Sequence, residues 1–127
     1  MPAEKPTELV WIGSSLEDLK AFPDDVQDVI GYALHLAQMG GKHPRAKPLR
    51  GDAAFRGGGV LEIVDDYDGD TYRAVYTVRY HDILYVLHCF QKKSKHGIAT
   101  PQPDIERIKR RLAVADAHYR SRQGGQP

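Results

Sequence analysis

Apolar and polar positions along the chain change their spacing several times, and each spacing predicts a different element. Residues 9–12 form a short apolar run ended by Gly13, which predicts a strand. Paired serines at 14 and 15 predict the start of a short helix, and a longer helix follows from Pro23 to Gly40 with apolar residues every three or four positions. We expect these two helices to form an antiparallel hairpin.

The middle of the chain alternates with a period of two and carries β-branched and aromatic residues, as strands do. Strands are predicted over Val60–Val64, Thr71–Arg79 and Ile83–Phe90, with an acidic turn over 65–70, and antiparallel pairing is expected. Thr100 and Pro101 begin a last helix. Its predicted buried side carries Ile105, Ile108, Leu112, Ala115 and Tyr119, and its predicted outer side carries Arg107, Lys109, Arg110 and Arg111.

The element order β-α-α-β-β-β-α predicts one α+β domain over 1–127, with the helices packed on one face of an antiparallel sheet and flexible tails at 1–7 and 121–127. A chain of 127 residues that is 41% hydrophobic suits a single core. No apolar run approaches the roughly 20 residues that span a bilayer, and no signal-peptide pattern opens the chain. The single cysteine excludes an internal disulfide or a multi-cysteine zinc site. We expect a cytoplasmic protein.

Charge is distributed unevenly although the net charge is only +1. Residues 40–59 contain five basic residues and one acidic residue, and residues 91–127 contain nine basic and three acidic residues. Two basic segments on an otherwise acidic chain are typical of a localised polyanion site, and an uneven surface arising by chance is the alternative interpretation.

Most sequence signatures of enzymes are absent: the chain has no P-loop, HExxH motif, dinucleotide fingerprint or nucleophile elbow. A glycine run at 57–59 lacks the lysine and helix start that a phosphate cradle needs, so it is interpreted as a flexible entry to a strand.

Cationic residues on the last two predicted strands form the main candidate site. A hairpin loop of two or four residues puts Arg73 on one face with His88, Phe90 and Lys92, and a two-residue loop puts Arg73 directly across from His88; a three-residue loop breaks this alignment. Arginine holds phosphate oxygens in a planar fork, and imidazole moves protons near neutral pH. No acidic pair lies nearby in the sequence for divalent metals, which favours metal-free cleavage of RNA, in which the 2′-hydroxyl attacks the adjacent phosphorus.

Each of these residues also has a structural interpretation. His88 is more often a satisfied structural histidine, and Arg73 is placed to pair with Glu62 on the neighbouring strand. The lysines at 92, 93 and 95 suit a solvated strand end, and the tyrosines at 72, 76, 80 and 85 suit packing. Cys89 falls on the opposite face from His88 and is expected to be a buried thiol.

Several of these segments, in order, resemble one family. The segment Leu87-His88-Cys89-Phe90-Gln91-Lys92-Lys93-Ser94-Lys95-His96-Gly97-Ile98-Ala99-Thr100-Pro101 is similar to the strand-to-helix segment of phage-derived HigB-like toxins in the RelE/ParE superfamily. The strand over 72–76, the Lys47–Gly51 loop, the Gly59–Ile63 strand and the last helix also resemble that family. One departure is Ser94, where the family frequently has threonine.

The resemblance implies a RelE-like fold and the toxin of a type II toxin–antitoxin system. Members of the HigB and RelE branches cleave messenger RNA, usually on the ribosome, without a cofactor or metal, and a HigA-like helix-turn-helix antitoxin neutralises them. Carried over by position, the resemblance implies phosphate contacts for Arg50, Arg73, Lys92 and Lys93 and proton transfer by His88. We expect Arg73, His88, Lys92 and Lys93 to be catalytic, and RNA phosphates to be bound by Lys47, Arg50, Arg56, Lys95 and His96. Two alternatives stay open: a ParE-like inhibitor of DNA gyrase, and a non-catalytic prophage remnant that only binds its antitoxin.

Overall fold

The computed structural model describes residues 6–92 and 100–124. Its elements follow the predicted order with two short additions. They are β1 (Glu8–Trp11), α1 (Ser15–Lys20), α2 (Asp24–Gln38), β2 (Ala46–Pro48), the 3-10 turn η1 (Ala53–Phe55), β3 (Val60–Tyr67), β4 (Asp70–Thr77), β5 (Ile83–Lys92) and α3 (Gln102–Gly124). The antiparallel hairpin of α1 and α2 stays a prediction.

The five strands form one sheet in the order β1-β5-β4-β3-β2. Three neighbouring pairs are antiparallel, but β1 runs parallel to β5. The prediction of a purely antiparallel sheet is therefore wrong at this edge. The strand β2 was missed because three residues, one of them a proline, are too few to show an alternating pattern.

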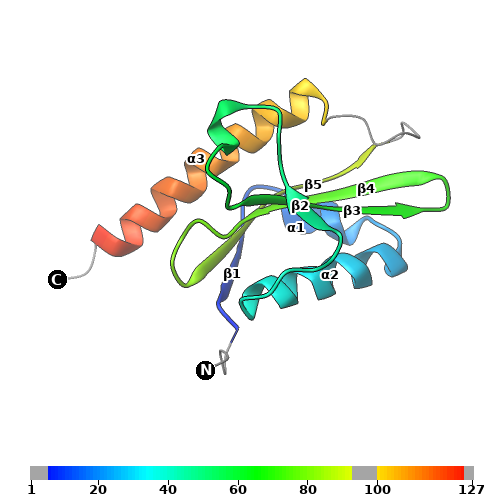
Figure 1. Cartoon of the computed structure of the whole chain (residues 1–127), viewed down its shortest axis with the longest axis horizontal. Helices are drawn as coiled ribbons and strands as arrows, with labels where there is room; N and C mark the ends of the chain where they lie inside the picture. The colour runs from blue at the N-terminus through cyan, green and yellow to red at the C-terminus, as the bar shows by residue number, and fades with distance from the viewer. Residues whose placement is uncertain (1–5, 93–99, 125–127) are drawn as a thin grey trace.

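Helices cover both faces of the sheet, so the prediction that they pack on one face is wrong. One core cluster joins α1 and α2 to one face, through residues such as Leu19, Ile30 and Val86. A second core cluster joins α3 and the 49–59 loop to the other face, through residues such as Phe55, Val75 and Ile108. Figure 1 shows α2 and α3 on opposite sides of the sheet. Continuous burial along β4 and β5 is what a sheet covered on both faces requires.

A two-residue turn at Asp68–Gly69 joins β3 to β4. Both residues have positive φ angles, 51° and 85°, as in the tight turns that match the twist of hairpin strands. The pairing of Tyr67 with Asp70 closes the turn. The strand β3 therefore runs three residues beyond the predicted end at Val64, and Asp65 and Asp66 belong to the strand instead of the turn.

A β-bulge divides the β4–β5 hairpin into two registers. Near its loop Thr77 pairs with Tyr85 and Tyr76 with Val86, whereas beyond the bulge Val75 pairs with His88. The bulge inserts Leu87 and so changes which side chains of β5 face α3. The loop between β4 and β5 covers residues 78–82, so the condition of a two- or four-residue loop is not met, but the bulge gives the alignment that such a loop would give.

Both predicted tails are shorter than expected where the structure describes them. The helix α3 continues to Gly124, so residues 121–124 are helical. Near the other end, the backbone N–H of Thr7 donates to the carbonyl of Gln38 at 3.0 Å, which ties this residue to the end of α2.

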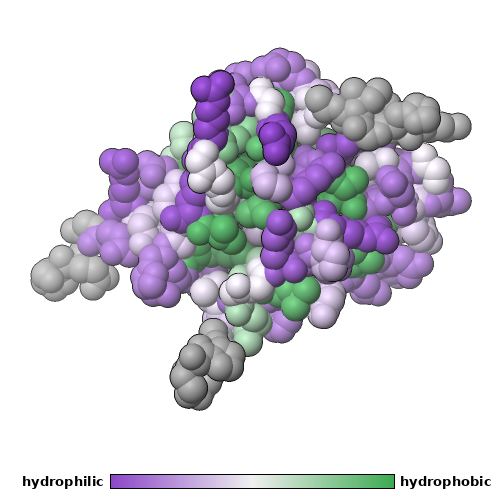
Figure 2. Space-filling view, in the orientation of Figure 1, coloured by the Kyte–Doolittle hydropathy of each residue, from purple (hydrophilic) through white to green (hydrophobic). Residues whose placement is uncertain are grey.

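Burial of the apolar positions leaves a surface in which hydrophilic residues surround smaller hydrophobic areas (Figure 2).

Candidate functional site

Four strand and helix segments bring ionisable side chains together at the beginning of α3. The bulge leaves His88, Phe90 and Lys92 on the face of β5 that α3 covers, and Arg73 lies on the same face of β4. The shared face was predicted correctly. The direct partner of Arg73 is Phe90, so the direct pairing with His88, which was expected only for a two-residue loop, does not occur.

Arg73 forms a buried ion pair with Glu62. Its Nη1 lies 3.2 Å from Oε1 of Glu62, and the two side chains are 3% and 6% exposed. The Oγ1 of Thr100 lies 3.5 Å from both the guanidinium and the carboxylate, and the exposed Nζ of Lys47 lies 3.6 Å from Oε1 of Glu62. The structural interpretation of Arg73, a cross-strand ion pair, is thereby confirmed, and Glu62 joins two of the predicted site residues.

His88 is held between two charged side chains of α3. Its Nε2 is 2.8 Å from Oδ1 of Asp104, Nη1 of Arg111 lies 3.5 Å from its Nδ1, and its ring stacks on Phe90 with centroids 4.6 Å apart. Burial lowers the pKa of His88, although Asp104 opposes that shift. A neutral ring fits these contacts, since Nε2–H then donates to the carboxylate and Nδ1 accepts from the guanidinium.

Lys92 completes this group, which we call the α3-end cluster: Glu62, Arg73, His88, Lys92, Thr100 and Asp104. Desolvation, followed by the neighbouring charge of Arg73, lowers the pKa of Lys92, while Glu62 and Asp104 oppose the shift. On β5, Lys92 pairs with Thr71, which lies two residues before Arg73 on β4. The cluster therefore mixes both signs of charge at close range.

The cluster is less open than the predicted cationic face. Arg73 and His88 are 3% and 2% exposed, and Lys92 is also buried. Asp104 is the member of the His88 pair that reaches solvent, with 24% of its side chain exposed. Beside it lies a cavity of about 330 Å³, whose lining includes His88, Asp104 and Arg107. The cavity therefore opens the cluster to solvent on the side of Asp104, whereas Arg73 is buried.

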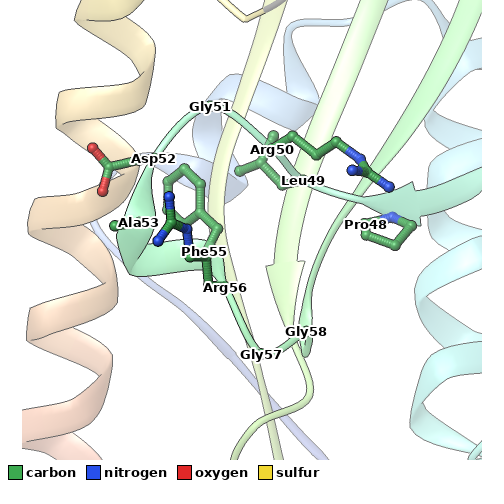
Figure 3. Close-up of a pocket in the computed structure, with 10 residues that line it drawn as sticks. All are labelled: Pro48, Leu49, Arg50, Gly51, Asp52, Ala53, Phe55, Arg56, Gly57 and Gly58. Atoms are coloured by element: carbon green, nitrogen blue, oxygen red, sulfur yellow. The ribbon is translucent and has the colours of Figure 1, made fainter.

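Two predicted phosphate-binding residues lie on a separate surface. Arg50 and Arg56 are exposed and line a cavity of about 790 Å³ formed by the loop between β2 and β3. In Figure 3 the guanidinium of Arg56 lies beside Asp52 and Phe55, whereas that of Arg50 extends toward Pro48. The structure thus separates the predicted cations into a buried, paired set and an exposed set. Lys93, Lys95 and His96 lie outside the described residues.

Sequence reasoning assigned no site role to Asp104 or Arg111. Arg111 was expected on the outer side of the last helix. Arg111 in fact points inward, where it donates to the carbonyl of Leu87 at 3.0 Å and to Ser14 Oγ at 3.0 Å. An available signal was the position of Asp104 in the first turn of a helix that follows a cationic strand.

The other predicted structural roles hold. Cys89 is buried on the face opposite His88, and burial raises its pKa to about 12. Tyr72, Tyr76 and Tyr85 are buried in the two cores, and Tyr80 packs on Tyr85 and Tyr119.

Within residues 6–92 and 100–124, no group of three or more His, Cys, Asp or Glu side chains is arranged to hold a metal ion. Over the same residues, none of the helices has the length and apolar character needed to cross a membrane.

Comparison with known proteins assigns the family. Residues 17–113, about three quarters of the chain, match the family described as phage-derived protein Gp49-like (DUF891), and the chain belongs to that family. Among solved structures, the chain is similar to one from the toxin–antitoxin complex RelBE2 of Mycobacterium tuberculosis, with 16% identity and a TM-score of 0.45. That similarity covers 74% of this chain and 100% of the other. No curated protein matches the sequence.

Proposed function

We propose that this protein is the HigB-like toxin of a type II toxin–antitoxin system and that it cleaves messenger RNA on the ribosome, in the cytoplasm, without a metal ion. The observation that carries the proposal is the α3-end cluster, which joins a guanidinium, an ammonium, an imidazole and one carboxylate on one face of β3–β5 to the carboxylate of Asp104 on α3. Membership of the phage-derived Gp49-like family supports it. A HigA-like helix-turn-helix antitoxin is the proposed partner.

The proposed reaction uses the 2′-hydroxyl of the RNA as nucleophile. The His88–Asp104 pair accepts the 2′-hydroxyl proton as the 2′-oxygen attacks phosphorus, the bond between phosphorus and the 5′-oxygen breaks, and the leaving 5′-oxygen takes a proton from a water molecule. Lys92, with Lys93, contacts the phosphate and stabilises the developing negative charge. The products carry a 2′,3′-cyclic phosphate and a 5′-hydroxyl.

Arg73 contributes to the proposed reaction through its electrostatic field. A guanidinium fixed by Glu62 in a water-poor site stabilises charge at short range more strongly than the same group in solvent. Lys47, Arg50, Arg56, Lys95 and His96 are proposed to hold the phosphates on either side of the cleaved linkage. Their cationic side chains give the binding a strong dependence on salt concentration.

Brief induction in a bacterial host tests the proposal. Wild-type protein is expected to arrest growth and to create new 5′ ends within codons, mapped by primer extension. Lys92→Ala is expected to abolish these ends, and Lys92→Arg to restore part of them, because the reaction needs a cation at this position. Arg120→Ala, which removes an exposed cation at the far end of α3, is the matched control and keeps full toxicity.

Other outcomes contradict the proposal in distinct ways. Cleaved plasmid DNA with intact transcripts identifies a gyrase inhibitor. Normal growth with a folded wild-type protein leaves a remnant that only binds its antitoxin. Full toxicity in a folded Lys92→Ala variant removes that lysine from the reaction.

A further inference from the structure

Both ring nitrogens of His88 contact charged side chains of α3. The Nε2 atom lies 2.8 Å from Oδ1 of Asp104, the Nδ1 atom lies 3.5 Å from Nη1 of Arg111, and only 2% of the histidine is exposed. The resemblance to known toxins implies proton transfer by this histidine. Whether it can take a proton from RNA depends on what each ring nitrogen already does.

Arg111 determines which nitrogen of the ring carries the hydrogen. A guanidinium has five N–H donors, has no acceptor and stays charged in proteins, so the Nδ1 atom that faces it has to be the acceptor. A neutral His88 then carries its hydrogen on Nε2 and donates it to Asp104. The one lone pair of the ring is directed at Arg111, so the ring has none with which to accept a proton from a substrate.

Contacts with three segments hold the Arg111 guanidinium in place. Its Nη1 donates at 3.0 Å to the carbonyl of Leu87, the residue that the β-bulge adds to β5. Its Nη2 donates at 3.0 Å to Oγ of Ser14, and that hydroxyl donates at 2.8 Å to Asp18 of α1. Gly13, with a φ angle of 59°, lies so close that a Cβ there would be 2.8 Å from Nε of Arg111. These contacts fix the guanidinium beside the ring.

Asp104 is the solvent-facing end of this series of contacts. Its side chain is 24% exposed and lines the cavity of about 330 Å³ together with His88 and Arg107. Its Oδ1 accepts from His88, whereas its Oδ2 accepts no hydrogen bond from residues 6–92 and 100–124. Asp104 therefore has an oxygen available to receive a proton from a substrate hydroxyl.

The charges around His88 agree with a neutral ring. Desolvation lowers the pKa of His88, Asp104 opposes that shift, and the positive charges of Arg111 and Arg107 lower the pKa further. Asp18 of α1 also lines the cavity beside the ring. A ring that stays neutral keeps its Nε2–H directed at the carboxylate and holds the orientation of that carboxylate.

We infer that Asp104 is the residue that accepts the 2′-hydroxyl proton in the proposed cleavage, and that Arg111 is the positioning residue that keeps His88 from doing so. The inference rests on the proposed function and assigns one step of it. The proton passes from the 2′-oxygen to Asp104 as the bond between that oxygen and phosphorus forms. The bond between phosphorus and the 5′-oxygen breaks, and water supplies a proton to the leaving oxygen.

Single-turnover cleavage of a message on programmed ribosomes, at saturating protein, tests which residue takes the proton. Asp104→Asn is expected to lower the rate constant about 100- to 10,000-fold, because an amide cannot act as the base. His88→Gln is expected to lower it about 10-fold or less, the equivalent of one hydrogen bond, since the glutamine amide can still donate to Asp104. Asp116→Asn, further along α3 and 41% exposed, is the matched control and keeps the wild-type rate.

Nitrogen NMR spectra of the histidine rings test the role of Arg111 without RNA. At pH 7.5 the ring of His88, identified by its loss in His88→Gln, is expected to show an unprotonated Nδ1 and a protonated Nε2. Arg111→Met is expected to remove this preference and to lower the cleavage rate constant about 10-fold, and Arg111→Lys, which keeps a cationic donor, to restore both in part. An arginine that only packs would leave the tautomer unchanged.

Distinct results overturn the inference. Cleavage at the wild-type rate by a folded Asp104→Asn protein refutes the assignment and leaves the proposed function standing. A larger loss in His88→Gln than in Asp104→Asn, or a protonated Nδ1 in the wild type, assigns the proton transfer to the histidine. The wild-type tautomer in Arg111→Met removes the positioning role of the arginine. An uncut message with folded wild-type protein refutes the proposed function and this step together.

Discussion

Removal of the Glu62 carboxylate is expected to destabilise the protein strongly. Glu62→Gln keeps the size of the side chain but removes the negative charge that pairs with the buried Arg73 guanidinium. Only 3% of the Arg73 side chain and 6% of the Glu62 side chain are exposed. Loss of one partner from a buried ion pair costs about 3 kcal/mol or more. At 127 residues, the unfolding entropy is roughly 270 cal/mol/K, so about 3 kcal/mol lowers the melting temperature by about 11 °C.

Calorimetry of Glu62→Gln beside Glu106→Gln checks this expectation. Glu106 lies on the outer side of α3, 47% exposed and 3.9 Å from Lys109, so its neutralisation changes the melting temperature by about 2 °C at most. A double variant, Glu62→Gln with Arg73→Met, is expected to be more stable than the sum of the single effects, because the guanidinium that has lost its carboxylate is then removed as well. Equal melting temperatures for Glu62→Gln and Glu106→Gln would show that solvent compensates Arg73, which would refute the burial argument.

Three further predictions follow from single residues. Because burial lowers the pKa of His88, this histidine binds a proton more readily in the unfolded chain than in the folded one. Its contribution to the free energy of unfolding is therefore fully present above pH 6.5 and declines as the pH falls below that value. His88→Gln should flatten this decline in urea titrations between pH 7.5 and 5. A slope unchanged in the variant would assign it to other groups. Gly59→Ala should lower the free energy of unfolding by about 2 kcal/mol and Gly57→Ala by about 1 kcal/mol, because a Cβ at 59, unlike one at 57, lies 2.6 Å from Arg79 Cγ. Equal urea midpoints for the two variants would show that this clash has no effect. Cys89, with its pKa raised to about 12, should resist alkylation at pH 8 until the chain unfolds, and rapid labelling of the folded protein would contradict its burial.

The sequence predicts the elements well and their arrangement less well. Period-two alternation placed the three long strands, and helical spacing placed α2 and α3, because each pattern reports local burial. The same patterns do not say which helix covers which face of a sheet, nor that β1 joins β5 in parallel. Those features depend on contacts between residues far apart in the chain.

The candidate site could also be predicted only in part from the sequence. Strand periodicity put Arg73, His88 and Lys92 on one face only on the condition of a two- or four-residue loop, whereas the shared face exists because of a bulge at Leu87. A bulge is one added residue that no spacing reveals beforehand. The pairing of Arg73 with Glu62 was visible as an alternative, since both lie on facing strands. The contacts of His88 with Asp104 and Arg111 needed the position of α3.

The ends of the RNA fragments test the central claim most directly. Programmed ribosomes carrying a 5′-labelled message are incubated with the purified protein in excess chelator, and the termini of the fragments are identified by treatment with phosphatase and kinase. The account predicts cuts within codons that leave 2′,3′-cyclic phosphate and 5′-hydroxyl ends, and none with Lys92→Ala. Fragments with 3′-hydroxyl and 5′-phosphate ends, or an uncut message with a folded and binding-competent protein, would contradict it.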